Sequence, residues 1–396
     1  MSGAFLDSPL AALEYVAATL AQYPERQALP IRAAARSGLR RRDSGLCLNY
    51  LAVPEDHGQS VDAVQLPEIE TPVGADGELA RQMTQVLRPL SMLNPVSPVL
   101  ALGKGVGTLV PSFGIPLDAA TDHSPAYTMS LEDALKQPVP CPTTSGLLPE
   151  IHERIDFIKS RLPAGRGFYM NLPNMQGLFN LAHAILGEDA MIGPLIKPEL
   201  YREFMLRMTD FWIGAWRQLH AWIGPEWMTP DRRDIVHLGF CSVNLVSTDF
   251  YLEHVLPYDL RLARELDFPL SIHPCSGPHV FRATLEQLPN VVATQAGFIE
   301  KTAAGAISVD AALDMIGTRP IALDIGQELP QGDEFEFIRR DFDRYAEHPR
   351  LTFSYTGMHW RIRDRERIQS IHRHLDDYWR SRYGGEGNEL NERSTT

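Results

Sequence analysis

The chain has 396 residues, 44% of them hydrophobic and 22% charged, a composition typical of a globular protein with one large core or two ordinary domains. Its 37 Lys and Arg against 50 Asp and Glu give a formal net charge of −13 at pH 7. Because nucleic acids and anionic membranes require clustered cations, this acidic balance excludes both as expected partners and leaves a small-molecule substrate.

The predicted elements alternate between short apolar strands and amphipathic helices. A helix is expected over residues 9–23 and another over 78–93, with a proline-rich loop over 53–76 between them. Strands are expected over 46–52, 99–103, 167–172, 235–240, 270–274, 291–295, 321–325 and 351–355. The helices expected between them include 198–223, 251–266, 278–288, 308–316 and 364–383.

Eight such alternations with near-continuous apolar strands predict a parallel sheet that is covered on both faces, and eight is the strand number of a (β/α)8 TIM barrel. An open, doubly wound sheet of six or seven strands is the alternative, because the first two strands are weak. We therefore expect an N-terminal extension over 1–95, a barrel domain over 96–383 and a polar, glycine-rich, disordered tail over 384–396.

Four cysteines, Cys47, Cys141, Cys241 and Cys275, are widely spaced and form no CxxC pair. The first residues show no basic segment followed by an apolar one, so a secretory signal is not expected. Both observations favour a cytoplasmic protein whose thiols are buried, metal-bound or catalytic and not disulfide-bonded.

Polar side chains at the carboxyl ends of the expected strands are the candidate site, because parallel barrels carry their chemistry there. Asp324 is expected to orient a ligand or act as a base, Glu328 has a similar role, and Tyr355 is a candidate proton donor. Asn171 and Gln295 are candidates for binding polar groups of a substrate or cofactor. Ion pairing, rim packing and, for the nearby Asn174, helix capping are the structural alternatives. The candidate residues are Asn171, Cys241, His273, Cys275, Gln295, Asp324, Glu328, Tyr355 and His359.

The segment that ends in His273, Pro274 and Cys275 is the most informative of these. Strand alternation places the imidazole and the thiol on one side, where they can supply two of the three protein ligands of a catalytic zinc. Cys241 and His359 are both candidates for the third ligand. A buried cysteine beside a hydrogen-bonded histidine is the structural alternative.

Several segments are similar to the uroporphyrinogen decarboxylase superfamily. They are NMQGLFNLAHAILGED over 174–189, IKPE over 196–199, FYLEHVLPY over 250–258, FG over 113–114 and DRERI over 364–368. The similarity spans roughly residues 95 to 380. It implies a (β/α)8 barrel with its active site in the mouth, and a superfamily that includes porphyrinogen decarboxylases and zinc-dependent methyltransferases acting between corrinoids and thiols.

Both branches differ from this chain in part. The arginine-rich signature of the decarboxylases is reduced to PIRAAAR over 30–36, and their late Gly-His-Gly is replaced by YTGMH over 355–359. In the methyltransferases His-x-Cys is followed by a second Cys, and here that position falls near Gly357.

The resemblance therefore favours the methyltransferase branch: a Zn²⁺ enzyme that moves a methyl group to a thiol-type acceptor, with a corrinoid, carried by a corrinoid protein, as methyl donor. It also suggests a homodimer. A metal-independent decarboxylase or lyase acting on a polycarboxylate or porphyrin-like substrate is the first alternative. A non-catalytic barrel that binds a ligand or a corrinoid protein is the second.

Overall fold

The computed structural model describes the central part of the chain and shorter stretches towards its ends. The described residues are 4–5, 8–21, 69–70, 99–118, 124–162, 169–228, 233–274, 278–296, 308–326, 334–345, 351–354, 370, 374, 377–378 and 381. The chain divides into two compact units. The central unit comprises Val99–Gly165 and Tyr169–Ile321, and the terminal unit comprises Met1–Pro98, Arg166–Phe168 and Ala322–Thr396.

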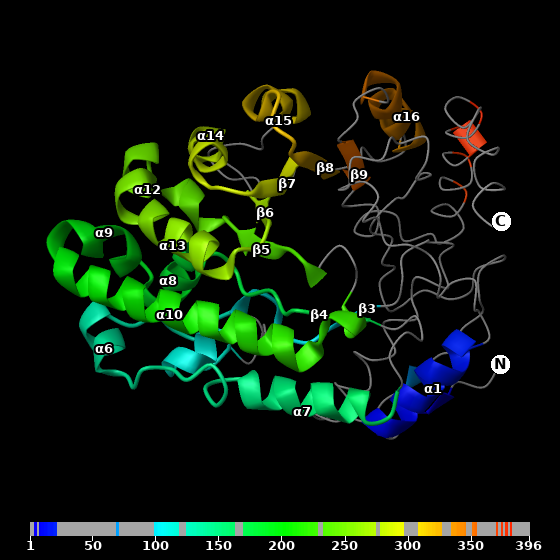
Figure 1. The fold of residues 1–396 in the computed structure, drawn as a ribbon, viewed down its shortest axis with the longest axis horizontal. Helices are drawn as coiled ribbons and strands as arrows, with labels where there is room; N and C mark the ends of the chain where they lie inside the picture. Colours follow the sequence, from blue (N-terminus) through cyan, green and yellow to red (C-terminus); the bar gives the residue numbers. More distant parts are fainter. Residues whose placement is uncertain are drawn as a thin grey trace. The chain divides into compact units, whose positions relative to one another are not determined.

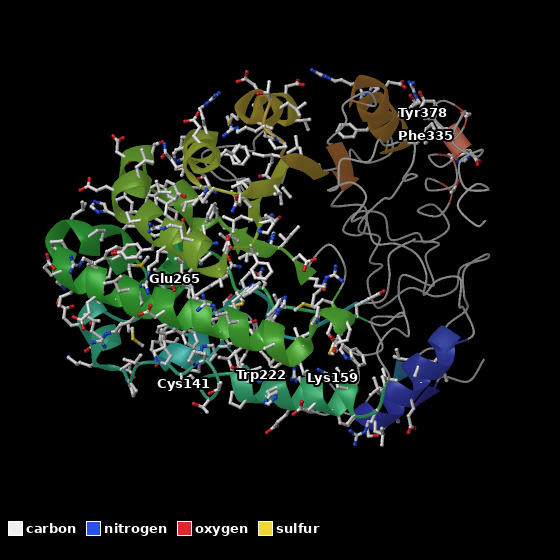
Figure 2. The ribbon with its side chains drawn as sticks, viewed as in Figure 1. Cys141, Lys159, Trp222, Glu265, Phe335 and Tyr378 are labelled. Carbon is white, nitrogen blue, oxygen red and sulfur yellow. The ribbon has the colours of Figure 1, made fainter. Side chains whose placement is uncertain are left out.

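The terminal unit contains two pairs of parallel strands. Strand β1 (Ala4–Phe5) pairs with β2 (Ile69–Glu70), and β8 (Ala322–Gly326) pairs with β9 (Leu351–Ser354). Its described helices are α1 (Pro9–Ala21) and α16 (Glu334–Tyr345). Phe335 of α16 packs edge to face against Tyr378, with ring centroids 6.5 Å apart, and both residues are labelled in Figure 2.

The central unit is built on parallel strands that alternate with helices. Strand β3 (Val99–Ala101) pairs with β4 (Tyr169–Asn171). Strand β6 (Leu270–His273) lies between β5 (Val236–Gly239) and β7 (Val291–Ala296), and all three are parallel. Parallel strands need crossover connections, and helices supply them here after β5, β6 and β7. The expected α/β class with a parallel sheet is therefore confirmed.

Nine helices and four short 3-10 turns are described in the central unit. The helices are α6 (Leu131–Lys136), α7 (Leu148–Lys159), α8 (Leu178–Leu186), α9 (Asp189–Ile196), α10 (Pro198–Ile223), α12 (Thr248–His254), α13 (Leu256–Leu266), α14 (Pro278–Gln287) and α15 (Val309–Ile316). The 3-10 turns are η2 (Gly105–Gly107), η3 (Val110–Phe113), η4 (Pro225–Trp227) and η5 (Ser242–Leu245).

Helix α10 is the central helix in the core of the central unit. It packs against α6, α7, α8, α9 and α13, and Figure 1 shows it as the long green helix of this unit. Trp212 is completely buried, and its indole N–H donates to the carbonyl of Met175 at 3.1 Å, so the polar end of the ring is satisfied. At the C-terminal end of α10, the Lys159 ammonium of α7 donates to the carbonyl of Trp222 at 3.0 Å and stabilises the last turn of the helix (Figure 2).

Most expected elements of the central unit occur with small changes of boundary. The helix expected over 251–266 is the exception, because it is divided into α12 and α13 at Val255. Pro257 lies in the first turn of α13, where its missing N–H costs nothing, but within a continuous helix its ring would clash with the preceding turn. The strand expected over 46–52 and the helix expected over 78–93 lie outside the described residues. Among the helices of the described part, none combines the length and apolarity needed to cross a membrane.

Candidate functional site

The carboxyl ends of β4, β5 and β6 converge in the central unit. The segment that follows β4 contacts the end of β5 through the backbone, where the Gly177 N–H donates to the Gly239 carbonyl at 2.9 Å. The Phe240 N–H donates to the His273 carbonyl at 2.8 Å, which continues the ladder between β5 and β6 past their last paired residues. Side chains that follow these strands are thereby brought to one edge of the sheet that contains β5 and β6.

A buried chain of amides fixes this edge. Gln176 and Asn180 are both buried, and the Asn180 amide N–H donates to Gln176 Oε1 at 2.6 Å. Asn180 Oδ1 in turn accepts from the backbone N–H of Ser242 at 2.7 Å. Both ends of the Asn180 amide are therefore used, so helix α8 is tied to the turn that follows β5.

The backbone of this edge is too crowded for side chains at two glycines. A Cβ atom at Gly177 would lie 2.5 Å from the Gly239 carbonyl oxygen, and one at Gly239 would lie 2.8 Å from Gln176 Oε1. Gln176 itself has a positive φ of 60°, a conformation uncommon for a residue with a side chain. The close approach of the turn before α8 to the end of β5 therefore depends on these two glycines.

His183 of α8 lies next to Ser242, with its Nδ1 atom 3.1 Å from Ser242 Oγ. Burial lowers the pKa of His183, because desolvation disfavours the charged imidazole. The neutral ring can both donate and accept a hydrogen bond, as a proton-transferring group must.

Two further imidazoles, His237 and His273, lie on neighbouring strands. Their ring centroids are 6.2 Å apart with ring planes at 47°, and His237 Nδ1 lies 3.4 Å from Ser271 Oγ. Both rings are half-buried. Because His273 pairs in register with Gly239, which is two residues beyond His237, the two rings are on the same face of the sheet.

Cys241 is half-buried in the turn after β5 and is disulfide-bonded. The prediction that the thiols are not disulfide-bonded is therefore wrong for Cys241. Cys141, by contrast, is free and exposed in the loop before α7 (Figure 2). The disulfide partner of Cys241 is therefore either Cys47 or Cys275. Both of these lie outside the described residues.

The structure describes only part of the predicted site. Asn171 is half-buried at the end of β4. Gln295 is on β7 and Asp324 on β8, where it pairs in register with Thr352, but their side chains lie outside the described part of the chain. The residues that lie outside it altogether are Cys275, Glu328, Tyr355 and His359.

Asn174 does not cap α8, contrary to the expected alternative. Its Oδ1 atom accepts from the Gln176 N–H at 3.0 Å, whereas the residue at the N-cap of α8 is Gly177, with no side-chain cap. The short side chain of Asn174 bonds to the backbone two residues on, as in an Asx turn, and so stabilises the tight turn that leads into the helix.

The described donors do not complete a zinc site by themselves. Within the described ranges, no group of three or more His, Cys, Asp or Glu side chains is placed to hold a metal ion. A disulfide sulfur is not a thiolate, so Cys241 cannot ligate zinc in this oxidised state.

Four members of this edge were not among the predicted site residues: Asn180, His183, His237 and Ser242. One sequence signal was available for His237, because this polar residue lies near the carboxyl end of the strand expected over 235–240. No comparable signal points to Asn180, whose partner Ser242 is 62 residues away in the chain.

Comparison with known proteins supports the fold class. No protein-family model matches the sequence, and no curated protein matches it. Among solved structures, the fold is similar to that of a methyltransferase from Methanosarcina mazei, with a TM-score of 0.54 at 14% sequence identity. The match covers 76% of this chain and 86% of the methyltransferase. At this identity the likeness concerns the fold alone.

Proposed function

We propose that this protein is a methyltransferase of the uroporphyrinogen decarboxylase superfamily with a closed (β/α)8 barrel. The observation that carries the proposal is the likeness of its fold to a methyltransferase over 76% of the chain. The sequence resemblance adds the superfamily, and the alternation of parallel strands and helices in the central unit is consistent with a barrel.

The substrate is proposed to bind at the carboxyl ends of β5 and β6. There His237 and His273 present half-buried imidazoles on one face, which can hold a polar acceptor and accept its proton. The Gln176–Asn180 amide chain holds the turn of Ser242, which follows β5, in place. The acceptor is proposed to be a thiol and the methyl donor a corrinoid carried by a second protein, with the enzyme acting as a homodimer.

Zinc is the proposed metal, held by His273 and Cys275 with either His359 or reduced Cys241 as third ligand. When bound, zinc supplies a Lewis acid that lowers the pKa of a coordinated thiol. Asp324, Glu328 and Tyr355 remain proposed catalytic groups, and Asn171 and Gln295 proposed binding groups.

The test is methyl transfer from methylcobalamin to a small thiol by the purified, reduced protein. The reaction is measured as the loss of the methylated corrinoid's absorbance. Replacement of the proposed ligand His273 by Ala is expected to lower the rate by about 100-fold or more. His152→Ala is the matched control, because His152 lies on α7 and stacks on Trp222, outside the site. Absence of transfer by the wild type, or full activity of H273A, would overturn the proposal; release of carbon dioxide from a reduced porphyrinogen would replace it with the lyase.

A further inference from the structure

Three donor side chains lie around Gly239, the last residue of β5. We propose that His237, His273 and the side-chain oxygen of Gln176 bind one divalent metal ion there, of the borderline class that includes zinc, cobalt and nickel. The site does not depend on the proposed function, whereas a part for this ion in methyl transfer rests on it. Binding by these three donors needs no reduction of the Cys241 disulfide.

Strand register brings both imidazoles next to Gly239. Gly239 pairs in register with His273 of β6, and His237 precedes Gly239 by two residues within β5. Paired positions of neighbouring strands share a face of the sheet, and so do positions two residues apart on one strand. Both rings are therefore on the face to which a side chain at position 239 would point. All three positions lie inside the two strands.

The separation of the two rings is close to that of two ligands on one ion. Their centroids are 6.2 Å apart, and both side chains are half-buried. With metal–nitrogen bonds of about 2.0–2.1 Å, two imidazoles on one zinc ion have centroids about 5–6 Å apart. A small rotation of the two side chains therefore closes them on an ion.

Ser271 can orient the imidazole of His237. His237 Nδ1 lies 3.4 Å from Ser271 Oγ. When Nδ1–H donates to this hydroxyl, the lone pair of the neutral ring is on Nε2, where a metal ion can bind. Histidine ligands of metal ions are usually held in this way, by a hydrogen bond from the ring nitrogen that does not bind the metal.

The Gln176 amide supplies the third donor, an oxygen. A Cβ atom at Gly239 would lie 2.8 Å from Gln176 Oε1, so this oxygen occupies the space above Gly239 on the face of the two rings. The Asn180 amide nitrogen donates to Gln176 Oε1 at 2.6 Å, while Asn180 Oδ1 accepts from the Ser242 N–H, so the direction of both amides is fixed. A carbonyl oxygen has two lone pairs, and the bond from Asn180 uses one of them.

The chemistry of these donors indicates the class of ion. Two imidazole nitrogens and an amide oxygen form a neutral set, which suits a borderline divalent ion more than Ca²⁺ or Mg²⁺, which prefer oxygen ligands. Within the described ranges, no third His, Cys, Asp or Glu side chain joins the two histidines, so the amide oxygen is the third protein ligand. When bound, such an ion supplies a Lewis acid at the carboxyl ends of β5 and β6.

Zinc titration of the purified full-length protein tests the site. Bound metal is first removed with EDTA, the protein is kept without reductant, and Zn²⁺ binding is measured by competition with a chromophoric chelator. His237→Ala and His273→Ala are each expected to weaken Zn²⁺ binding by about 100-fold, because each removes one ligand. His152→Ala on α7 is expected to bind as the wild type does. Unchanged affinity of H237A, or an equal loss in H152A, would overturn the proposal.

A substitution at Gln176 tests the oxygen ligand by a gain of affinity. Gln176→Glu keeps an oxygen that accepts from Asn180 and adds a negative charge next to the ion, so Zn²⁺ is expected to bind about tenfold more tightly. Gln287→Glu, at the exposed end of α14, is the control for the added charge and is expected to leave the affinity unchanged. Equal or weaker binding by Q176E would overturn the three-donor site.

Chemical modification of the wild type locates the ion without any variant. Diethyl pyrocarbonate modifies neutral imidazoles, and peptide mass spectrometry measures the modification of each histidine. Zn²⁺ is expected to protect His237 and His273, whereas His152 is modified equally with and without Zn²⁺. Equal modification of His237 in both states would overturn the site. Because these measurements use no methyl donor, protection at both histidines without methyl transfer would overturn the proposed function alone.

Discussion

Asp259 of α13 is a buried carboxyl group with an incomplete set of hydrogen bonds. Its side chain is fully buried, and Oδ2 accepts from the Tyr251 hydroxyl of α12 at 3.3 Å. Oδ1 and the buried Tyr201 hydroxyl of α10 have no hydrogen-bond partner within the described residues. Desolvation raises the pKa of Asp259 from 3.8 to about 7, because burial penalises the carboxylate.

The consequence is a loss of stability as the pH rises. The folded chain keeps the Asp259 proton up to about pH 7, whereas the unfolded chain loses it near its ordinary pKa of 3.8. Each pH unit in this interval therefore lowers the free energy of unfolding by about 1.4 kcal/mol, or about 4 kcal/mol over the whole interval. Above about pH 7 both states are ionised, and the contribution becomes constant.

Asp259→Asn removes this titration and keeps an oxygen that can accept from Tyr251. Urea unfolding of wild type and variant at about pH 5 and about pH 8 is the measurement. Relative to the wild type, the variant's free energy of unfolding is expected to rise by about 3 kcal/mol between these pH values. Effects of the substitution on packing cancel, because they are present at both.

Asp249→Asn, on the exposed surface of α12, is the control for the loss of one negative charge. Two results would refute the reasoning that the buried carboxyl holds its proton. One is a rise below about 0.5 kcal/mol in the free energy of unfolding of D259N, relative to the wild type, between the two pH values. The other is a rise for D249N as large as that for D259N.

Three further outcomes follow from the site and its surroundings. Gly177→Ala is expected to lower stability by about 1–3 kcal/mol in urea unfolding, because the new Cβ meets the Gly239 carbonyl oxygen; an unchanged midpoint would contradict the close approach. Asn180→Ala is expected to cost about 1–3 kcal/mol and to speed hydrogen exchange at the Ser242 N–H, which loses its acceptor; unchanged exchange would show that the bond does not protect this amide. Hydrogen bonds from neighbouring threonines lower the pKa of Cys141 to about 7, so its alkylation by iodoacetamide, measured by mass spectrometry, is expected to rise only about tenfold from pH 6 to pH 8; a rise near a hundredfold would contradict it.

The central unit could be predicted well where one local signal decides an element. Helix α10 has the expected bounds because Pro198 is favourable in a first helical turn and Gly224, with φ 78°, leaves the helical conformation. The single helix expected over 251–266 was wrong because its apolar periodicity continues across Pro257, and periodicity alone does not register the missing N–H.

The site was predictable only in its strand-end positions. The rule for carboxyl ends selected Cys241 and His273, which the structure does bring to one edge. The partners of Asn180 and the oxidation state of Cys241 depend on segments far apart in the chain, so no local pattern could reveal them.

The hydrogen bond between Gly177 and Gly239 joins the start of α8 to the end of β5 through main-chain atoms only, and the Asn180 amide likewise bonds to the main chain at Ser242. The frame of this edge therefore does not rely on which side chains occupy positions 237, 241 and 273. Such a separation lets selection exchange the reactive groups one at a time while the scaffold beneath them stays in register, so chains of this fold can diverge in chemistry without first having to refold.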